Sequence, residues 1–158
     1  MFIDNQTKEQ QVWQRVQASR GEAPRNDLRQ LQREAMELAA IYRQLSAQLP
    51  IGPKELAAKL YRGEKANVSA LAGIGILSRQ GGETLKVWQP GKEAANMQLQ
   101  RCYHRSLRCM TEYLARSAEP EYGVVFERMA KREGEHCELI AQLLGNLGDA
   151  DNFRKGNL

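Results

Sequence analysis

The sequence predicts an all-α protein, a four-helix bundle made of two antiparallel helical hairpins joined by a long crossover, with a short additional helix near the N-terminus. Three observations in the 158 residues lead to this class. Apolar residues recur at spacings of three and four along four long segments, which is the pattern of a helix with one buried stripe. Proline and glycine separate these segments. No strand-like alternation of useful length occurs.

The first hairpin is expected over residues 26–79. Its first helix follows Pro24, takes Asn26 or Asp27 as its N-cap, and runs from about 28 to 48. Its expected inward stripe is Leu28, Leu31, Ala35, Leu38, Ala39, Tyr42, Leu45 and Leu49. The segment PIGP breaks the chain, and Pro53 suits the first turn of a second helix that extends to about 79. Its expected inward residues are Leu56, Leu60, Ala66, Leu71 and Ile74.

The second hairpin is expected over residues 92–145. Its first helix runs from about 92 to 117, with Met97, Leu99, Tyr103, Leu107, Met110 and Leu114 inward. After a turn at Pro120, the last helix runs from 121 to 144 and ends at Gly145, a natural C-cap residue. Residues 1–25 then form an arm with a short helix over 7–19, residues 26–145 form the bundle, and residues 146–158 form a flexible tail.

The connection between the hairpins predicts the topology. Helices of this length measure about 33–40 Å. The irregular residues 80–91 contain two glycine-rich breaks and reach about 40 Å when extended. Such a segment can return along the whole bundle, so that the second and third helices point in the same direction.

Composition excludes several classes of function. The net charge of +4 comes from well-mixed charges without a run of basic residues, which indicates no specific nucleic-acid partner. No apolar stretch is long enough for a membrane helix and the N-terminus lacks a secretion signal, so we expect a cytoplasmic protein without membrane contact. Cys102, Cys109 and Cys137 form no Cys-x-x-Cys pair, which excludes a rubredoxin-type iron site and favours buried packing.

The strongest chemical signal is Glu133 and His136 in the last helix. At a spacing of three residues, a carboxylate and an imidazole leave the same helix face and can meet one metal ion. The second helix carries Glu64 and Asn67 at the same spacing. The repeat extends further, because Leu56, Leu60, Glu64, Asn67 and Leu71 match Val125, Met129, Glu133, His136 and Ile140 with one constant offset. This pattern indicates a duplicated helical hairpin.

Over about residues 26–145 the chain resembles the rubrerythrin-like branch of the ferritin-like superfamily. The similar stretches are YRQLS at 42–46, RSAEPEYGVVF at 116–126 and EGEH at 133–136. The resemblance implies a ferritin-like bundle in which two iron or manganese ions react with peroxide or oxygen. In such proteins the second and fourth helices each supply Glu-x-x-His, and the first and third each supply one Glu.

The chain departs from this ligand set at three positions. Asn67 replaces one histidine, and Ala35 and Ser106 stand where the family has carboxylates. Glu34 and Glu37 are rotated from Ala35 by about 100° and 200° around the helix, and only a register shift of one residue would return Glu34 to the site. His104 is displaced from Ser106 in the same way. We therefore expect Glu64, Glu133 and His136, with Asn67 as a weak ligand, to hold one iron or manganese ion or none rather than two.

Two functions follow from this degenerate di-metal site. The first is a rubrerythrin-like metalloprotein with weak or no peroxide- or oxygen-linked oxidoreductase activity, which needs an external electron donor. The alternative is a non-enzymatic helical scaffold, an interaction or assembly module that has lost metal binding. The missing carboxylates favour the second function, and the intact Glu133 and His136 favour the first.

The remaining side chains receive structural interpretations. Tyr42 and Tyr113 are expected to pack between helices with their hydroxyls bonded. Glu135 and Glu138 are expected to face solvent. The basic stripe of the third helix, with Arg101, Arg105 and Arg108 beside His104, is interpreted as a solvated face, and a contact with an acidic partner or a second subunit is the alternative. Trp13 and Trp88 are interpreted as covers of the bundle ends or as contacts with a second subunit, since this fold commonly forms homo-oligomers and a dimer is expected.

Overall fold

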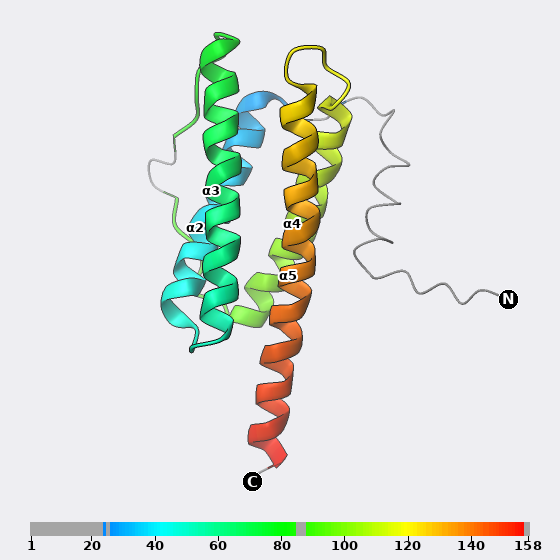
Figure 1. The fold of residues 1–158 in the computed structure, drawn as a ribbon. Coiled ribbons are helices and arrows are strands. Elements are labelled where there is room, and N and C mark those ends of the chain that lie inside the picture. The colour runs from blue at the N-terminus through cyan, green and yellow to red at the C-terminus, as the bar shows by residue number, and fades with distance from the viewer. Residues whose placement is uncertain (1–23, 25, 85–87, 157–158) are drawn as a thin grey trace, which may run out of the picture.

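The computed structural model describes residues 24, 26–84 and 88–156 of the chain. In these ranges the backbone forms four helices and no strand (Figure 1): α2 Leu28–Gln48, α3 Pro53–Leu77, α4 Ala95–Arg116 and α5 Gly123–Gly156. The prediction of an all-helical bundle is confirmed. The short helix expected over residues 7–19, and Trp13 with it, lies outside the described residues.

The four helices form a closed bundle with a long crossover. α2 packs against α3 and α4, and α5 packs against the same two helices, so α3 and α4 are diagonal partners. Figure 1 shows α3 and α4 running in the same direction, which requires the connection to return along the bundle. Hydrogen bonds place this connection beside α2. Gln32 Nε2 donates to Gly81 O at 3.2 Å, and Gln44 Nε2 donates to Gly91 O at 3.4 Å near the other end of α2.

Local chemistry fixes where the first hairpin begins and turns. Asp27 caps α2, because its side chain accepts from Gln30 N at 2.8 Å while the Gln30 side chain accepts from Asp27 N at 2.8 Å. Gly52 precedes α3 with a φ of 100°, a backbone conformation that favours glycine. The expected cap and the helix start at Pro53 are both confirmed.

The core lies along the bundle axis and follows the predicted stripes with two exceptions. All eight apolar residues expected inward from the first helix are buried. Ala66 and Met97, however, are exposed, so their predicted inward positions are wrong. Each sits one residue away from a buried polar residue, Asn67 and Gln98. One residue turns a helix by about 100°, so the polar residue faces the axis and its apolar neighbour faces outward.

The last helix is longer than the sequence suggested. The expected end at Gly145 is wrong, because α5 continues to Gly156 through most of the region expected to be a tail. Leu144 and Leu147 both pack against the core, which extends the apolar stripe past the glycine. A single glycine inside a helix costs only about 1 kcal/mol relative to alanine, and continued packing offsets that cost.

Surface pairs join helices that are distant in sequence. Arg105 on α4 pairs with two carboxylates of α2, Glu34 Oε1 at 2.5 Å and Glu37 Oε1 at 2.8 Å. The predicted basic stripe is therefore not fully solvated, since Arg105 is partly buried between two helices. Trp88 packs against the core. Within the described residues, no helix combines the length and the hydropathy needed to cross a membrane.

Candidate metal centre

Four polar side chains meet inside the bundle, midway along two neighbouring helices. Glu64 and Asn67 come from α3, and Glu133 and His136 come from α5; all four are buried. Each pair is spaced by three residues, so both of its members leave the same helix face. Because α3 packs directly against α5, the two faces oppose each other. The structure thus brings together every residue proposed as a metal ligand.

The ligand atoms of this cluster are close to one another. His136 Nδ1 lies 3.1 Å from Glu64 Oε2 and 3.5 Å from Glu133 Oε2. One donor atom from each of these three residues lies within 4.8 Å of the others. A single imidazole nitrogen therefore faces both carboxylates. This arrangement is expected when three side chains can bind one metal ion.

Asn67 has a role that its position alone does not reveal. Its Nδ2 donates to Glu133 Oε1 at 2.9 Å, and its Oδ1 accepts from Arg132 Nη1 at 2.6 Å. A carboxylate only accepts and a guanidinium only donates, so the two partners determine the orientation of the amide. The amide oxygen is already bonded to Arg132. Asn67 therefore acts in this structure as a donor that positions Glu133.

The register of α2 and α4 is settled by burial. Ala35 and Ser106 are both fully buried, as the resemblance placed them. Ser106 Oγ donates to Glu133 Oε2 and lies 3.2 Å from Glu133 O. Glu34 does not join the cluster, because its carboxylate bonds to Arg105 at the α2–α4 surface. The register shift that would return Glu34 to the site is excluded.

Burial and mutual contacts set the protonation of the cluster. Burial, followed by the negative charge of Glu133, raises the pKa of Glu64 well above its usual value. Burial also opposes ionisation of Glu133, but hydrogen bonds from His136, Glu64 and Ser106 outweigh it and lower the pKa of Glu133. Burial disfavours the His136 cation, yet hydrogen bonds to Glu133 and Glu64 raise its pKa to about 10. These shifts favour a protonated Glu64, an ionised Glu133 and a protonated His136.

The donor set fits one divalent transition metal ion. Metal–ligand bonds of about 2.1 Å place neighbouring donor atoms about 3.0–3.4 Å apart for angles between a right angle and a tetrahedral angle. The separation of 3.1 Å between His136 Nδ1 and Glu64 Oε2 falls within that range, and the separation of 3.5 Å to Glu133 Oε2 lies just above it. Glu64 Oε1 is buried and has no hydrogen-bond partner among the described residues. Such an oxygen is available to a cation.

Two tyrosines are buried in the bundle core, Tyr42 on α2 and Tyr113 on α4. Tyr42 and Tyr113 are fully buried, which confirms their packing role. The Tyr42 ring meets the His136 ring edge-on at 6.1 Å between centroids. The expectation that the hydroxyls find partners is wrong for Tyr113, whose hydroxyl has no hydrogen-bond partner within the described part of the chain. Burial raises the pKa of both phenols well above the usual value, so they stay neutral.

Gly63 makes room for the imidazole. A Cβ atom added at this position would lie 2.2 Å from His136 Nε2, which is closer than real contacts allow. We expect Gly63→Ala to displace the His136 ring, to weaken metal binding, and to destabilise the protein by about 1–3 kcal/mol, the usual cost of overpacking. Chemical denaturation and metal titration measure both effects.

Gly73 on the same helix provides the matched control for that substitution. Nothing lies within 4 Å of a Cβ atom added there. Gly73→Ala should therefore leave metal binding unchanged and stabilise the helix by up to about 1 kcal/mol. Equal behaviour of the two variants would contradict a steric role for Gly63.

Three contributors to the site were missed from the sequence. The sequence marks Ser106 only as an absent carboxylate, and it gives no signal for Arg132. The signal for Gly63 was present, because an isolated glycine inside a helix often has a packing reason. It directly precedes Glu64, and the helix turn places it beside the imidazole of the facing helix.

The fold and this site define a class, a four-helix bundle with a buried Glu–Glu–His cluster. Comparisons of the chain with protein-family models, with curated proteins and with solved structures yield no match. The functional interpretation therefore rests on the geometry of the cluster, together with the motif resemblance in the sequence.

Proposed function

We propose that this protein binds one divalent metal ion, iron or manganese, through Glu64, Glu133 and His136. The observation that carries this function is the convergence of three buried donor atoms from two helices within 4.8 Å. Two carboxylates and one imidazole form the donor set typical of mononuclear sites with open coordination positions. The same donors are too few for two ions, since only two negative charges are available.

Charge balance supports exchange of a metal ion for protons. Without metal, the pKa shifts favour a neutral cluster, in which an ionised Glu133 faces a protonated His136 and Glu64 keeps its proton. With metal, two ionised carboxylates and a neutral imidazole would balance one divalent cation. The buried site is thus electrically neutral in both states, which avoids the large cost of an uncompensated buried charge.

We place this site in a degenerate rubrerythrin-like protein of ferritin-like fold. The crossover between α3 and α4 and the repeated hairpins support this class. A bound iron or manganese ion would supply one-electron chemistry toward peroxide or oxygen, with electrons from an external donor. The chain's own residues orient the ligands, because Asn67 and Ser106 bond to Glu133. Tyr42 covers the imidazole.

A second function, a metal-free structural scaffold, is favoured by one specific observation. Glu133 already has hydrogen-bond partners from Asn67, Ser106 and His136, and so the cluster is largely satisfied without a metal ion. A buried polar network in which every group is hydrogen-bonded can have a purely structural role, because it specifies a unique packing of the core. Glu64 Oε1, which has no partner among the described residues, favours metal binding over this alternative.

Titration of chelator-treated protein with ferrous or manganous ion separates the two functions. We expect one ion per chain and release of about two protons per ion near neutral pH, one from Glu64 and one from His136. Calorimetry in buffers of different ionisation enthalpy measures the protons, and elemental analysis measures the metal. Two ions per chain would contradict the degenerate site, and no binding with no thermal stabilisation by either ion would support the scaffold.

A further inference from the structure

Arg132 on α5 is a partly buried arginine that pairs with no carboxylate. Among the described residues three arginines are partly buried, namely Arg105, Arg116 and Arg132. Arg105 and Arg116 each pair with carboxylates, as buried cations usually do. Arg132 forms no ion pair within the described part of the chain. It bonds instead to a neutral amide, from Nη1 to Asn67 Oδ1 at 2.6 Å.

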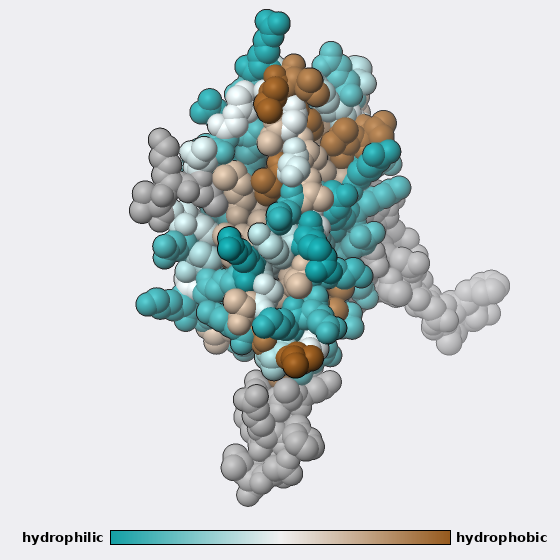
Figure 2. Space-filling view, turned by 60° about the vertical axis from the view of Figure 1, so that its left-hand side comes forward, coloured by the Kyte–Doolittle hydropathy of each residue, from teal (hydrophilic) through white to brown (hydrophobic). Residues whose placement is uncertain are grey.

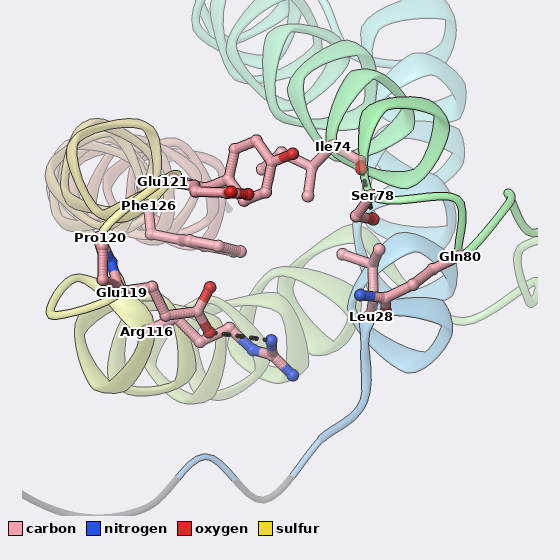
Figure 3. A pocket seen from close by; sticks show the side chains of 10 residues that line it. Leu28, Ile74, Ser78, Gln80, Arg116, Glu119, Pro120, Glu121 and Phe126 are labelled. Atoms are coloured by element: carbon pink, nitrogen blue, oxygen red, sulfur yellow. Dashed lines mark hydrogen bonds and ion pairs between the residues drawn. The ribbon is translucent and has the colours of Figure 1, made fainter.

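Arg116 illustrates the usual arrangement at one end of the bundle. Figure 3 shows its guanidinium bonded to Glu119, at 3.3 Å between Nη1 and Oε1, in the wall of a pocket of about 450 Å³. The pocket lies at the end where α3 terminates, and Figure 2 shows apolar residues gathered on the surface of that end. A nearby carboxylate therefore accounts for the partial burial of Arg116, whereas no carboxylate accounts for that of Arg132.

The Asn67 amide links Arg132 to the proposed ligand Glu133. Arg132 and Glu133 are neighbours in α5, and adjacent residues leave a helix about 100° apart. The guanidinium therefore lies beside the cluster, partly exposed, while Glu133 is fully buried. Asn67 on α3 joins the two, because its Oδ1 accepts from Arg132 and its Nδ2 donates to Glu133 Oε1 at 2.9 Å. A cation on the amide oxygen polarises the amide and strengthens the hydrogen bond that Nδ2 donates.

Both oxygens of the Glu133 carboxylate are held by hydrogen bonds. Oε1 accepts from Asn67 of α3, and Oε2 accepts from Ser106 of α4. A carboxylate oxygen has two lone pairs, so each oxygen keeps one for a cation. The last torsion of a glutamate side chain has a broad energy minimum, and donors on both oxygens restrict it. The protein itself thus orients this carboxylate, independently of a bound ion.

We propose that Arg132 is a positioning residue of the metal site, which holds the Glu133 carboxylate in its ligating orientation through Asn67. This role rests on the proposed function, since it concerns the affinity of the same site for its ion. Hydrogen-bonded partners orient metal ligands, and the loss of such a partner typically lowers metal affinity about 10–100-fold. Arg132 acts one hydrogen bond further out, on the amide that is itself the partner of Glu133.

The charge of Arg132 makes the direction of its effect informative. A guanidinium repels a divalent cation that lies near it. If Arg132 acted only through its charge, its removal would strengthen metal binding. A positioning role has the opposite sign, because metal binding weakens even though a repulsive charge is lost. The sign of the change in metal affinity therefore separates the two roles.

Calorimetric titration of chelator-treated protein tests this role, with ferrous or manganous ion, whichever the wild type binds more tightly. We expect Arg132→Ala to lower the affinity about tenfold or more. Arg128→Ala is the matched control, because Arg128 is exposed one turn earlier on α5 and forms no ion pair among the described residues. It should bind the ion at least as tightly as the wild type. Equal or tighter binding by Arg132→Ala would overturn the positioning role.

Combined substitutions test the route through Asn67. Asn67→Ala should weaken metal binding, since Glu133 loses a donor. Adding Arg132→Ala to Asn67→Ala should cause no further loss, because the amide that connects the guanidinium to Glu133 is already gone. Losses that multiply in the double variant would show that Arg132 acts by another route and would reject the role proposed for it.

NMR spectra of isotope-labelled protein without metal give a second readout. The side-chain amide signals of Asn67 should shift and exchange faster with water in Arg132→Ala, and should match the wild type in Arg128→Ala, while the backbone signals show that both variants are folded. Unchanged Asn67 signals in Arg132→Ala would contradict the hydrogen bond on which the role depends. A wild type that binds neither ion would reject the proposed function together with this role. Wild-type binding with no loss in Arg132→Ala would reject this role alone.

Discussion

Replacing His136 with alanine is expected to remove metal binding and to destabilise the protein. The imidazole Nδ1 is the atom that faces both carboxylates, at 3.1 Å from Glu64 and 3.5 Å from Glu133. Without it, two acidic side chains remain in a dry interior with no cationic partner in the cluster. Breaking a buried charge pair by removing one member costs about 3–5 kcal/mol. Metal per chain should fall from one to none, and the free energy of unfolding should fall by that range.

His104 is the natural control, because the chain has only two histidines. It lies exposed on α4, outside the cluster. His104→Ala should leave both the metal content and the free energy of unfolding within about 0.5 kcal/mol of the wild type. If His136→Ala still bound one ion per chain, the choice of this imidazole as a ligand would be wrong.

Raising the pH is expected to destabilise the metal-free protein much more than the metal-loaded protein. His136 has a folded-state pKa of about 10 against an ordinary value of 6.5. Its contribution to stability is therefore fully present below about pH 6.5 and is lost as the pH rises through about 10. Glu64 acts in the same direction, because its raised pKa means that folding favours the protonated acid.

The free energy of unfolding of the metal-free protein should fall by several kcal/mol on the alkaline side, since each pKa unit corresponds to about 1.4 kcal/mol. On the acid side the lowered pKa of Glu133 has the opposite sign, and its contribution falls as the pH drops below the ordinary value of 4.5. Urea denaturation of chelated protein at a series of pH values measures both effects. In metal-loaded protein the ion would take the place of the protons on Glu64 and His136. The fall in the free energy of unfolding at alkaline pH should therefore nearly disappear. Parallel pH profiles with and without metal would contradict binding at these residues.

Much of the fold was predictable because local patterns and packing agree. Every apolar residue expected inward from α2 is buried, and the Asp27 cap begins the helix where expected. Helical spacing alone places Glu133 beside His136 and Glu64 beside Asn67. The duplicated pattern indicated that the two pairs would face each other, since equivalent helices of two hairpins occupy equivalent positions in a bundle.

Other features depend on contacts that the sequence does not specify. The sequence does not fix the helix phase at single residues such as Ala66, because a small apolar side chain gains little from burial. The end of α5 was misplaced at Gly145, since packing of Leu147 on the core is a tertiary effect. The exclusion of Glu34 from the cluster follows from its bond to Arg105 on another helix.

The sequence by itself determined four amphipathic helices and two matched pairs of polar residues at one-turn spacing, because helical periodicity is a local property of the chain. Only the tertiary structure decided how these groups act on one another. Packing of α3 against α5 brings His136 between two carboxylates. Hydrogen bonds from α3 and α4 then hold Glu133 ionised in the interior. Distances and burial across helices set charge and ligand geometry, and those quantities exist only once the bundle has formed.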